Sequence, residues 1–298
     1  MKKFDYIIGN PAYQDESVGN QKTFQPPIYH RFIDAVYEIG NTVELIHPAR
    51  FLFNAGATPK EWNEKMLRDP HLKVLEHFQD SKSIFPGTDI KGGIVVTYRN
   101  VAVIGDPIGI YTPYPELRSV LSKVQSTDEF VAFSNIVSNR GLYRFSQEAY
   151  KEFPIETSKI TDSRIGASAF ERLSTLFSEE QTAANNQFTK FLGLLHGKRV
   201  YRWLRNDLYV PVASLNTYRV LLPGVNGSGV LGEPLSHPIV GIPGLAHTET
   251  FLTIGSFDTI GEADACLKYV KTKFCRSMLG ILKITQHNSA DKWACVPL

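Results

Sequence analysis

Short apolar runs alternate with amphipathic stretches along the first hundred residues of the chain. Two stretches place apolar residues at helical spacing between start and stop signals, namely 28–39 and 62–67. Four runs have the length and the β-branched or aromatic content typical of strands, namely 4–8, 43–46, 74–78 and 93–98. The order strand–helix–strand–helix–strand predicts parallel crossovers. The loop before the last run predicts an antiparallel hairpin at the sheet edge instead.

The pattern changes after about residue 107. Short runs separated by long loops follow, and 191–194 and 199–204 are among those that predict strands. Near the C-terminus, apolar residues on one face predict a single helix over 261–283. These features predict two domains, 1–107 and 108–298.

Composition limits the class of protein. A hydrophobic fraction of 43% in 298 residues is sufficient for a packed core, while a formal charge of +2 says little about partners. Three cysteines without a Cys-x-x-Cys spacing indicate neither a disulfide framework nor a zinc site, so we expect no metal. The sequence has no signal-peptide core and no run of about 18 apolar residues, which predicts a cytoplasmic location and no membrane partner.

The first apolar run stops abruptly at Gly9-Asn10-Pro11, and Tyr13 follows two residues later. In open α/β sheets, ligands bind outside the carboxyl ends of strands. An exocyclic amine on an aromatic base is a poor nucleophile because its lone pair is delocalised. The side-chain oxygen of Asn10 and the carbonyl of Pro11 can hold the two amine hydrogens and turn this lone pair out of the ring plane. Tyr13 offers a face on which an extruded base stacks. The alternative is an ordinary Asn-Pro turn.

The tetrapeptide Asn10-Pro11-Ala12-Tyr13 resembles the (Asn/Asp)-Pro-Pro-Tyr catalytic motif of S-adenosylmethionine-dependent amino-methyltransferases. Ala12 departs from the usual third residue but leaves the two acceptors and the ring in place. The resemblance implies that Asn10, Pro11 and Tyr13 are catalytic and that S-adenosylmethionine is the cofactor. DNA adenine, RNA adenine and protein glutamine methyltransferases share the tetrapeptide.

Two further segments narrow the resemblance. Residues 45–52 are similar to the family's strand after the motif's helix, and 85–93 resemble a hairpin loop of adenine methyltransferases in bacterial restriction–modification systems. This likeness implies that Phe85, Asp89 and Lys91 lie near the substrate base. For Phe85, a plug in the core is the alternative. His47 is interpreted as a strand-end residue and not as a general base.

Residues 254–286 resemble the C-terminal target-recognition region of restriction–modification methylases, a module that protein glutamine methyltransferases lack. The chain is therefore similar to type II N6-adenine DNA methyltransferases of the fused restriction–modification methylase family. The resemblance implies an α/β fold, in which the second half of a Rossmann-like methyltransferase sheet, parallel with an antiparallel edge hairpin, precedes an α+β target-recognition domain. It also implies double-stranded DNA as the partner.

Two basic clusters lie in the second half of the chain, over 190–219 and 268–283. Basic residues interleaved with aromatic residues suit contact with DNA phosphates and stacking on nucleobases. An ordinary amphipathic strand or a solvated surface explains the same pattern about equally well. The predicted DNA-binding residues are Lys198, Arg199, Arg202, Arg205, Lys271 and Lys273.

The family's glycine-rich cofactor motif precedes the catalytic motif, and the residues before Asn10 do not supply it. We therefore expect a missing N-terminal half or a complementing subunit, and an exposed apolar edge at 4–8 without it. A DNA-binding specificity module with no independent catalysis is the alternative function, and RNA adenine methylation is a third.

Overall fold

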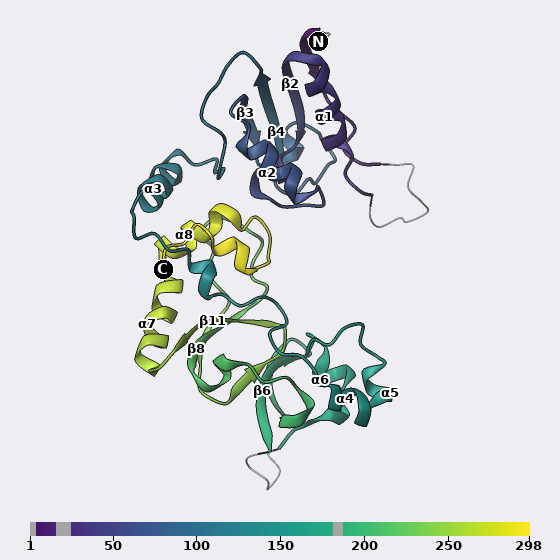
Figure 1. Ribbon diagram of the computed structural model, residues 1–298, viewed down its shortest axis with the longest axis vertical. Helices are drawn as coiled ribbons and strands as arrows, with labels where there is room; N and C mark the ends of the chain where they lie inside the picture. Colours follow the sequence, from purple (N-terminus) through teal and green to yellow (C-terminus); the bar gives the residue numbers. More distant parts are fainter. Residues whose placement is uncertain (1–3, 16–24, 181–186) are drawn as a thin grey trace. The chain divides into compact units, whose positions relative to one another are not determined.

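The computed structural model describes residues 4–15, 25–180 and 187–298, and the chain divides into two compact units, Met1–Val120 and Leu121–Leu298 (Figure 1). The division falls within helix α3 (Pro115–Gln125), downstream of the predicted boundary at residue 107. The roles predicted for the two domains remain predictions. No helix within the described ranges is long and apolar enough to cross a membrane.

The first unit contains a mixed four-stranded sheet in the order β1-β2-β4-β3. Strands β1 and β2 are parallel, whereas β4 is antiparallel to both β2 and β3. The predicted parallel pairing of the first two strands and the predicted antiparallel hairpin at the sheet edge are thus confirmed. The strands are β1 (Phe4–Gly9), β2 (Gly40–Pro48), β3 (Leu72–Phe78) and β4 (Ile94–Asn100).

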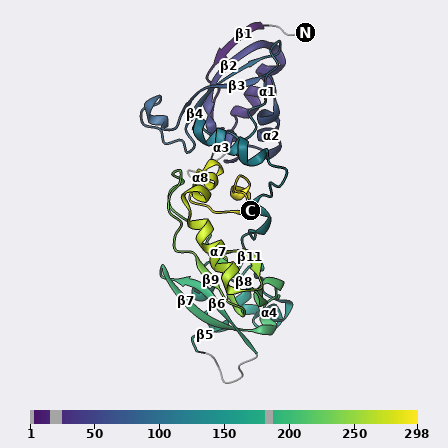
Figure 2. The same cartoon turned by 90° about the vertical axis from the view of Figure 1, so that its left-hand side faces the viewer.

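Helices α1 (Tyr29–Ile39) and α2 (Lys60–Arg68) lie on the same side of this sheet (Figure 2). Tyr29 of α1 stacks on His47 of β2 and meets Trp62 of α2 edge-on. The buried positions of α1 recur at intervals of four residues, as a helix with one apolar face requires. Burying a side chain such as Ile33 stabilises the fold by roughly 1.5–3 kcal/mol.

The opposite side of β1 is open. Tyr6 and Ile8 are registered with Thr42 and Glu44 of β2, and their exposed fractions are 73% and 79%. Since β1 ends the strand order, its outer backbone edge is also unpaired within the described part of the unit. The expected exposed apolar edge is therefore present.

The second unit has two sheets, β10-β6-β7-β5 and β11-β8-β9. His196 and Gly197, both at positive φ, form the two-residue turn between β6 and β7, which is the backbone that a tight hairpin requires. The strands predicted over 191–194 and 199–204 are confirmed as parts of β6 and β7. The strands are β5 (Phe177–Ser178), β6 (Phe188–Leu195), β7 (Lys198–Arg205), β8 (Tyr218–Pro223), β9 (Ile239–Gly241), β10 (Leu245–His247) and β11 (Phe251–Phe257).

One helix prediction is wrong. The stretch 261–283 forms two helices that break at Thr272, whose backbone is extended. The Thr272 hydroxyl accepts the backbone N–H of Cys275 at 3.1 Å and so caps the second helix. The helices of this unit are α4 (Gln147–Glu152), α5 (Pro154–Thr157), α6 (Ala169–Arg172), α7 (Ile260–Lys271) and α8 (Lys273–Leu282).

Candidate active site

The catalytic motif follows directly from the carboxyl end of β1. Because β1 and β2 are parallel, the segments after Gly9 and Pro48 leave the sheet at the same edge. Two backbone hydrogen bonds fix the motif to the start of α1: the N–H of Ile28 donates to the Tyr13 carbonyl at 3.1 Å, and the N–H of Asp15 donates to the Pro26 carbonyl at 2.9 Å. The turn thus holds its residues in a defined position.

Asn10 and Pro11 present two uncommitted acceptors. The Asn10 side chain is exposed, and neither its amide nor the Pro11 carbonyl has a hydrogen-bond partner among the described residues. Both residues line an open hollow of about 630 Å³, together with Ala12, Tyr13, Gln14, Asp15, Ile28 and Phe32. An incoming amine can therefore reach both oxygens without breaking an existing bond.

Tyr13 lies beside Phe85. The two rings are edge-on with centroids 6.3 Å apart. Burial raises the pKa of the Tyr13 hydroxyl to about 12, and this hydroxyl has no partner. Phe85 is half-buried and so is not a sealed core plug. Its loop is fixed because the Thr88 hydroxyl donates to the Phe85 carbonyl at 2.8 Å.

Tyr13 also lines a second cavity of about 450 Å³ within the first unit. Asp89 is in its wall and forms an ion pair with Lys91 at 3.1 Å, and Phe85 of the same loop lies edge-on to Tyr13. The remaining lining residues are Gln14, Gln25, Pro27, Tyr29, Pro48, Arg50, Gly56, Ala57, Thr58, Thr88 and Ile90.

Arg50, Tyr29 and Thr58 were not identified from the sequence as cavity residues. Arg50 follows β2, and its proximity to Tyr13 depends on the parallel pairing of β1 and β2. The only signal in the sequence was that Arg50 belongs to the segment 45–52 that resembles the family.

His47 is fully buried and has no access to either hollow. Its Nε2 lies 2.9 Å from the Thr97 hydroxyl, and its Nδ1 lies 3.2 Å from the Pro48 carbonyl. Burial lowers the pKa of His47 to about 4, so the ring is neutral at neutral pH. This environment favours the structural interpretation of His47 over a general base.

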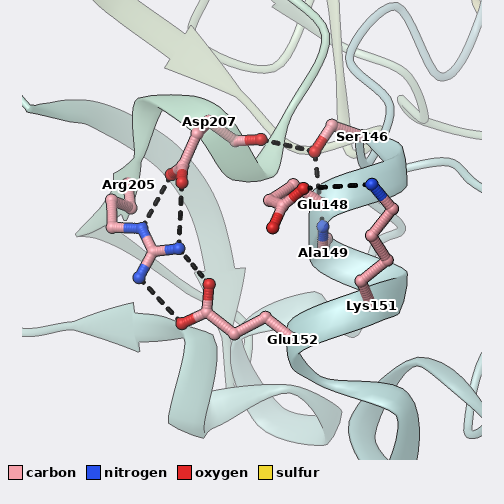
Figure 3. Close-up of polar contacts among 7 residues, drawn as sticks. All are labelled: Ser146, Glu148, Ala149, Lys151, Glu152, Arg205 and Asp207. Carbon is pink, nitrogen blue, oxygen red and sulfur yellow. Dashed lines mark hydrogen bonds and ion pairs between the residues drawn. The ribbon is translucent and has the colours of Figure 1, made fainter.

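The arginines of the predicted DNA-binding set make contacts within the second unit. Arg205 forms ion pairs with Glu152 and Asp207 (Figure 3). The hydrogen bonds to these two carboxylates raise the pKa of the Arg205 guanidinium. Arg202 pairs with Glu179 at 2.7 Å, and Arg199 donates to the carbonyls of Ser236 and His237 at 3.3 and 2.6 Å.

The lysines of the same set have a different environment. Lys198, Lys271 and Lys273 are exposed and form no ion pair with any described residue. Nearby, the Lys190 ammonium lies 4.5 Å from the ring centroid of Tyr201, which is 42% exposed. Within the predicted set, the three lysines thus lack an acidic partner among the described residues, whereas Arg202 and Arg205 are paired with acids.

The family match to known proteins lies in the first unit. Residues 1–85 match the family described as Eco57I restriction-modification methylase. A curated protein of Mycoplasma pneumoniae, described as an uncharacterized adenine-specific methylase, is 32% identical over 96 residues. The match covers 32% of this chain and 23% of that relative, so the chain spans less than a quarter of the relative's length. The resemblance to restriction–modification adenine methyltransferases is thus confirmed, and the family match locates it in residues 1–85.

A structural comparison extends over more of the chain but is weak. The solved structure of the type IIL restriction-modification enzyme MmeI in complex with DNA aligns with 96% of this chain and 45% of its own. The sequence identity is 10% and the TM-score is 0.37. A score of this size does not establish a shared fold.

Proposed function

We propose that this chain carries the amine-holding part of an N6-adenine DNA methyltransferase of a restriction–modification system. The observation that carries the proposal is the pair of uncommitted acceptors on Asn10 and Pro11, next to the aromatic pair Tyr13–Phe85. The family match over residues 1–85 and the adenine-specific relative support the same chemistry.

An adenine extruded from the duplex stacks on Tyr13 and donates its two amine hydrogens to the Asn10 side-chain oxygen and the Pro11 carbonyl. Two backbone hydrogen bonds hold the turn before the base arrives, and both acceptors are then available to stabilise the amine as positive charge develops on it. S-adenosylmethionine would supply the electrophilic methyl group. A strong base is not required, because the amine becomes acidic only as the new bond forms. The buried, neutral His47 agrees with this scheme.

The described residues of the first unit do not form a complete cofactor site. None of the strand-to-helix connections in this part of the unit is a glycine-rich turn that opens the following helix: β1 is followed by Asn10-Pro11, and β2 by a 3-10 helix. We propose that another methyltransferase half, from the same polypeptide or from a complementing subunit, supplies this site and pairs with the open edge of β1. The exposed side chains of Tyr6 and Ile8 fit such a neighbour. The assembly of both halves is the completed enzyme.

The second unit is proposed as the DNA target-recognition part. Its exposed, unpaired lysines suit phosphate contact, and the Lys190–Tyr201 pair combines a cation with a partly exposed ring. The incomplete cofactor site favours one alternative function, a DNA-binding specificity module without its own catalysis. Methylation by the completed enzyme separates the two, since a loss of methylation caused by Asn10→Ala in this chain contradicts a purely DNA-binding role.

Methylation assays test the proposal itself. The completed enzyme is expected to transfer tritiated methyl groups to adenine in duplex DNA and not to structured RNA, with the product identified as N6-methyladenine by mass spectrometry. Methylation of RNA alone, or of cytosine, contradicts the proposed substrate.

A further inference from the structure

Among the described residues, Arg50 is the positively charged side chain in the wall of the 450 Å³ cavity that Tyr13 lines. Its Nε donates to the Lys91 carbonyl at 2.7 Å, which fixes the plane of the guanidinium. The chain also folds closely over the aliphatic part of this side chain. Gly56 has a φ of +89°, and a Cβ at this position would lie 3.0 Å from the Arg50 Cδ. Arg50 is therefore held in place before any ligand binds.

Three other polar side chains of the cavity wall are already paired. Asp89 pairs with Lys91, the Thr58 hydroxyl donates to the Asn63 side-chain oxygen at 2.8 Å, and the Thr88 hydroxyl donates to a backbone carbonyl. Arg50 forms no ion pair with any described residue. Its terminal N–H groups are thus the charged donors of this cavity that remain available to a ligand.

We propose that Arg50 binds a backbone phosphate adjoining the extruded nucleotide. This inference rests on the proposed function, in which an adenosine nucleotide leaves the duplex and stacks on Tyr13. Such a nucleotide brings a phosphate on each side of its sugar. A guanidinium has donors only, and its planar fork matches two phosphate oxygens, whereas each ring nitrogen of adenine offers a single lone pair. A cavity of this volume is large enough for a small ligand.

Arg50 is therefore a positioning residue. It holds the sugar–phosphate while Asn10 and Pro11 hold the amine, and Tyr13 lies between the two groups because it lines both hollows. Its contribution is to the affinity for the nucleotide and not to the chemistry of the amine.

NMR titration of the chain with adenosine, adenosine 5′-monophosphate, adenosine 3′-monophosphate and inorganic phosphate tests the inference. At least one monophosphate is expected to bind about ten-fold more tightly than adenosine, as charge-assisted hydrogen bonds provide. The variant Arg50→Gln should abolish this preference and leave the affinity for adenosine unchanged. Arg50→Lys, which keeps the charge but not the fork, should retain part of it. Arg68→Gln is the matched control, because Arg68 is an exposed arginine of α2 and its loss changes the net charge equally.

Each outcome has a distinct meaning. Equal affinity for adenosine and both monophosphates, or a preference that persists in Arg50→Gln, overturns the role of Arg50 and leaves the proposed function standing. Inorganic phosphate that binds as tightly as the nucleotides also overturns it, because the site would then recognise a free anion. Failure of the chain to bind adenosine at all contradicts the proposed base site, and the inference with it.

Discussion

The ring of Tyr13 meets the ring of Phe85 at an interplanar angle of 75°. This contact joins the turn after β1 to the loop between β3 and β4, two segments far apart in the sequence. In an edge-on pair, the edge of one ring points at the face of the other, and neither ring is covered by a parallel partner. The arrangement is therefore compatible with a base that stacks on Tyr13 while Phe85 supports it from the side.

Replacing Asn10 should slow methylation without altering the fold. Asn10→Ala removes one of the two proposed acceptors, and the loss of one such group lowers the rate by roughly 10²–10³-fold. Asn10 is exposed and makes no hydrogen bond within the described residues, so the melting temperature should not change. Single-turnover methylation by the completed enzyme measures the effect. Asn139→Ala, at an exposed position in the second unit, is the control. An unchanged rate removes Asn10 from the mechanism.

The Tyr13 ring, and not its hydroxyl, should determine base binding. The hydroxyl is buried without a partner, so Tyr13→Phe should leave methylation unchanged and should not lower stability. Tyr13→Ala removes a stacking surface that contributes about 1–3 kcal/mol per base. We expect KM for DNA to rise in Tyr13→Ala while the cofactor affinity stays the same. Equal losses in the two variants would indicate that the hydroxyl acts in catalysis.

Two buried histidines should make the fold sensitive to acid. Burial lowers the pKa of both His47 and His247 to about 4, below the ordinary value of 6.5. The unfolded chain therefore binds more protons between these values, so the free energy of unfolding falls as the pH drops from about 6.5 to 4. The loss is on the order of 3 kcal/mol per histidine across this window, from about 1.4 kcal/mol per pKa unit.

NMR of the imidazole nitrogens tests this directly. Both rings should stay neutral down to about pH 4, and denaturant unfolding at pH 7, 6 and 5 should follow the same trend. Protonation of either ring near pH 6.5 in the folded chain contradicts the assignment.

The strands of the first unit could be predicted because each is a short local run of apolar residues with clear stops. The motif turn was also local, as it lies within four residues of the end of β1. By contrast, the position of Arg50 beside Tyr13 depends on the pairing of β1 with β2, and no local sequence pattern predicts which strands pair. The break at Thr272 was missed because apolar periodicity continues across it, whereas a single side-chain cap decides the geometry.

The basic residues of the second unit show a similar limit. Arg205 and Lys198 have the same charge in the sequence, but only Arg205 lies next to two carboxylates in the fold. One of these acids, Glu152, is on helix α4, far from Arg205 in the sequence. The sequence alone therefore does not distinguish a cation that is paired with an acid from one that is free to bind a ligand.

This difference leads to a prediction for DNA binding. Lys271→Gln and Lys273→Gln should each weaken binding to duplex DNA and reduce the slope of log K against log salt by about 0.9 for each phosphate that is no longer neutralised. Arg205→Gln should instead lower the melting temperature and leave the slope unchanged, because its charge is already balanced by Glu152 and Asp207. Fluorescence anisotropy at several salt concentrations measures the slopes. A reduced slope in Arg205→Gln with an unchanged melting temperature would show that this arginine binds a phosphate.

The open edge of β1 should govern assembly with the other methyltransferase half. Tyr6→Lys and Ile8→Lys place a charge on side chains that are 73% and 79% exposed, so the isolated chain should fold normally. A charged residue on an edge strand opposes strand pairing, so assembly should be weakened or lost. Light scattering after co-purification of the two halves measures it. Leu75→Lys is the matched control, since Leu75 is a 48% exposed residue on β3, the strand at the opposite edge of the sheet. Assembly that resists both β1 substitutions but fails in Leu75→Lys would move the interface to β3.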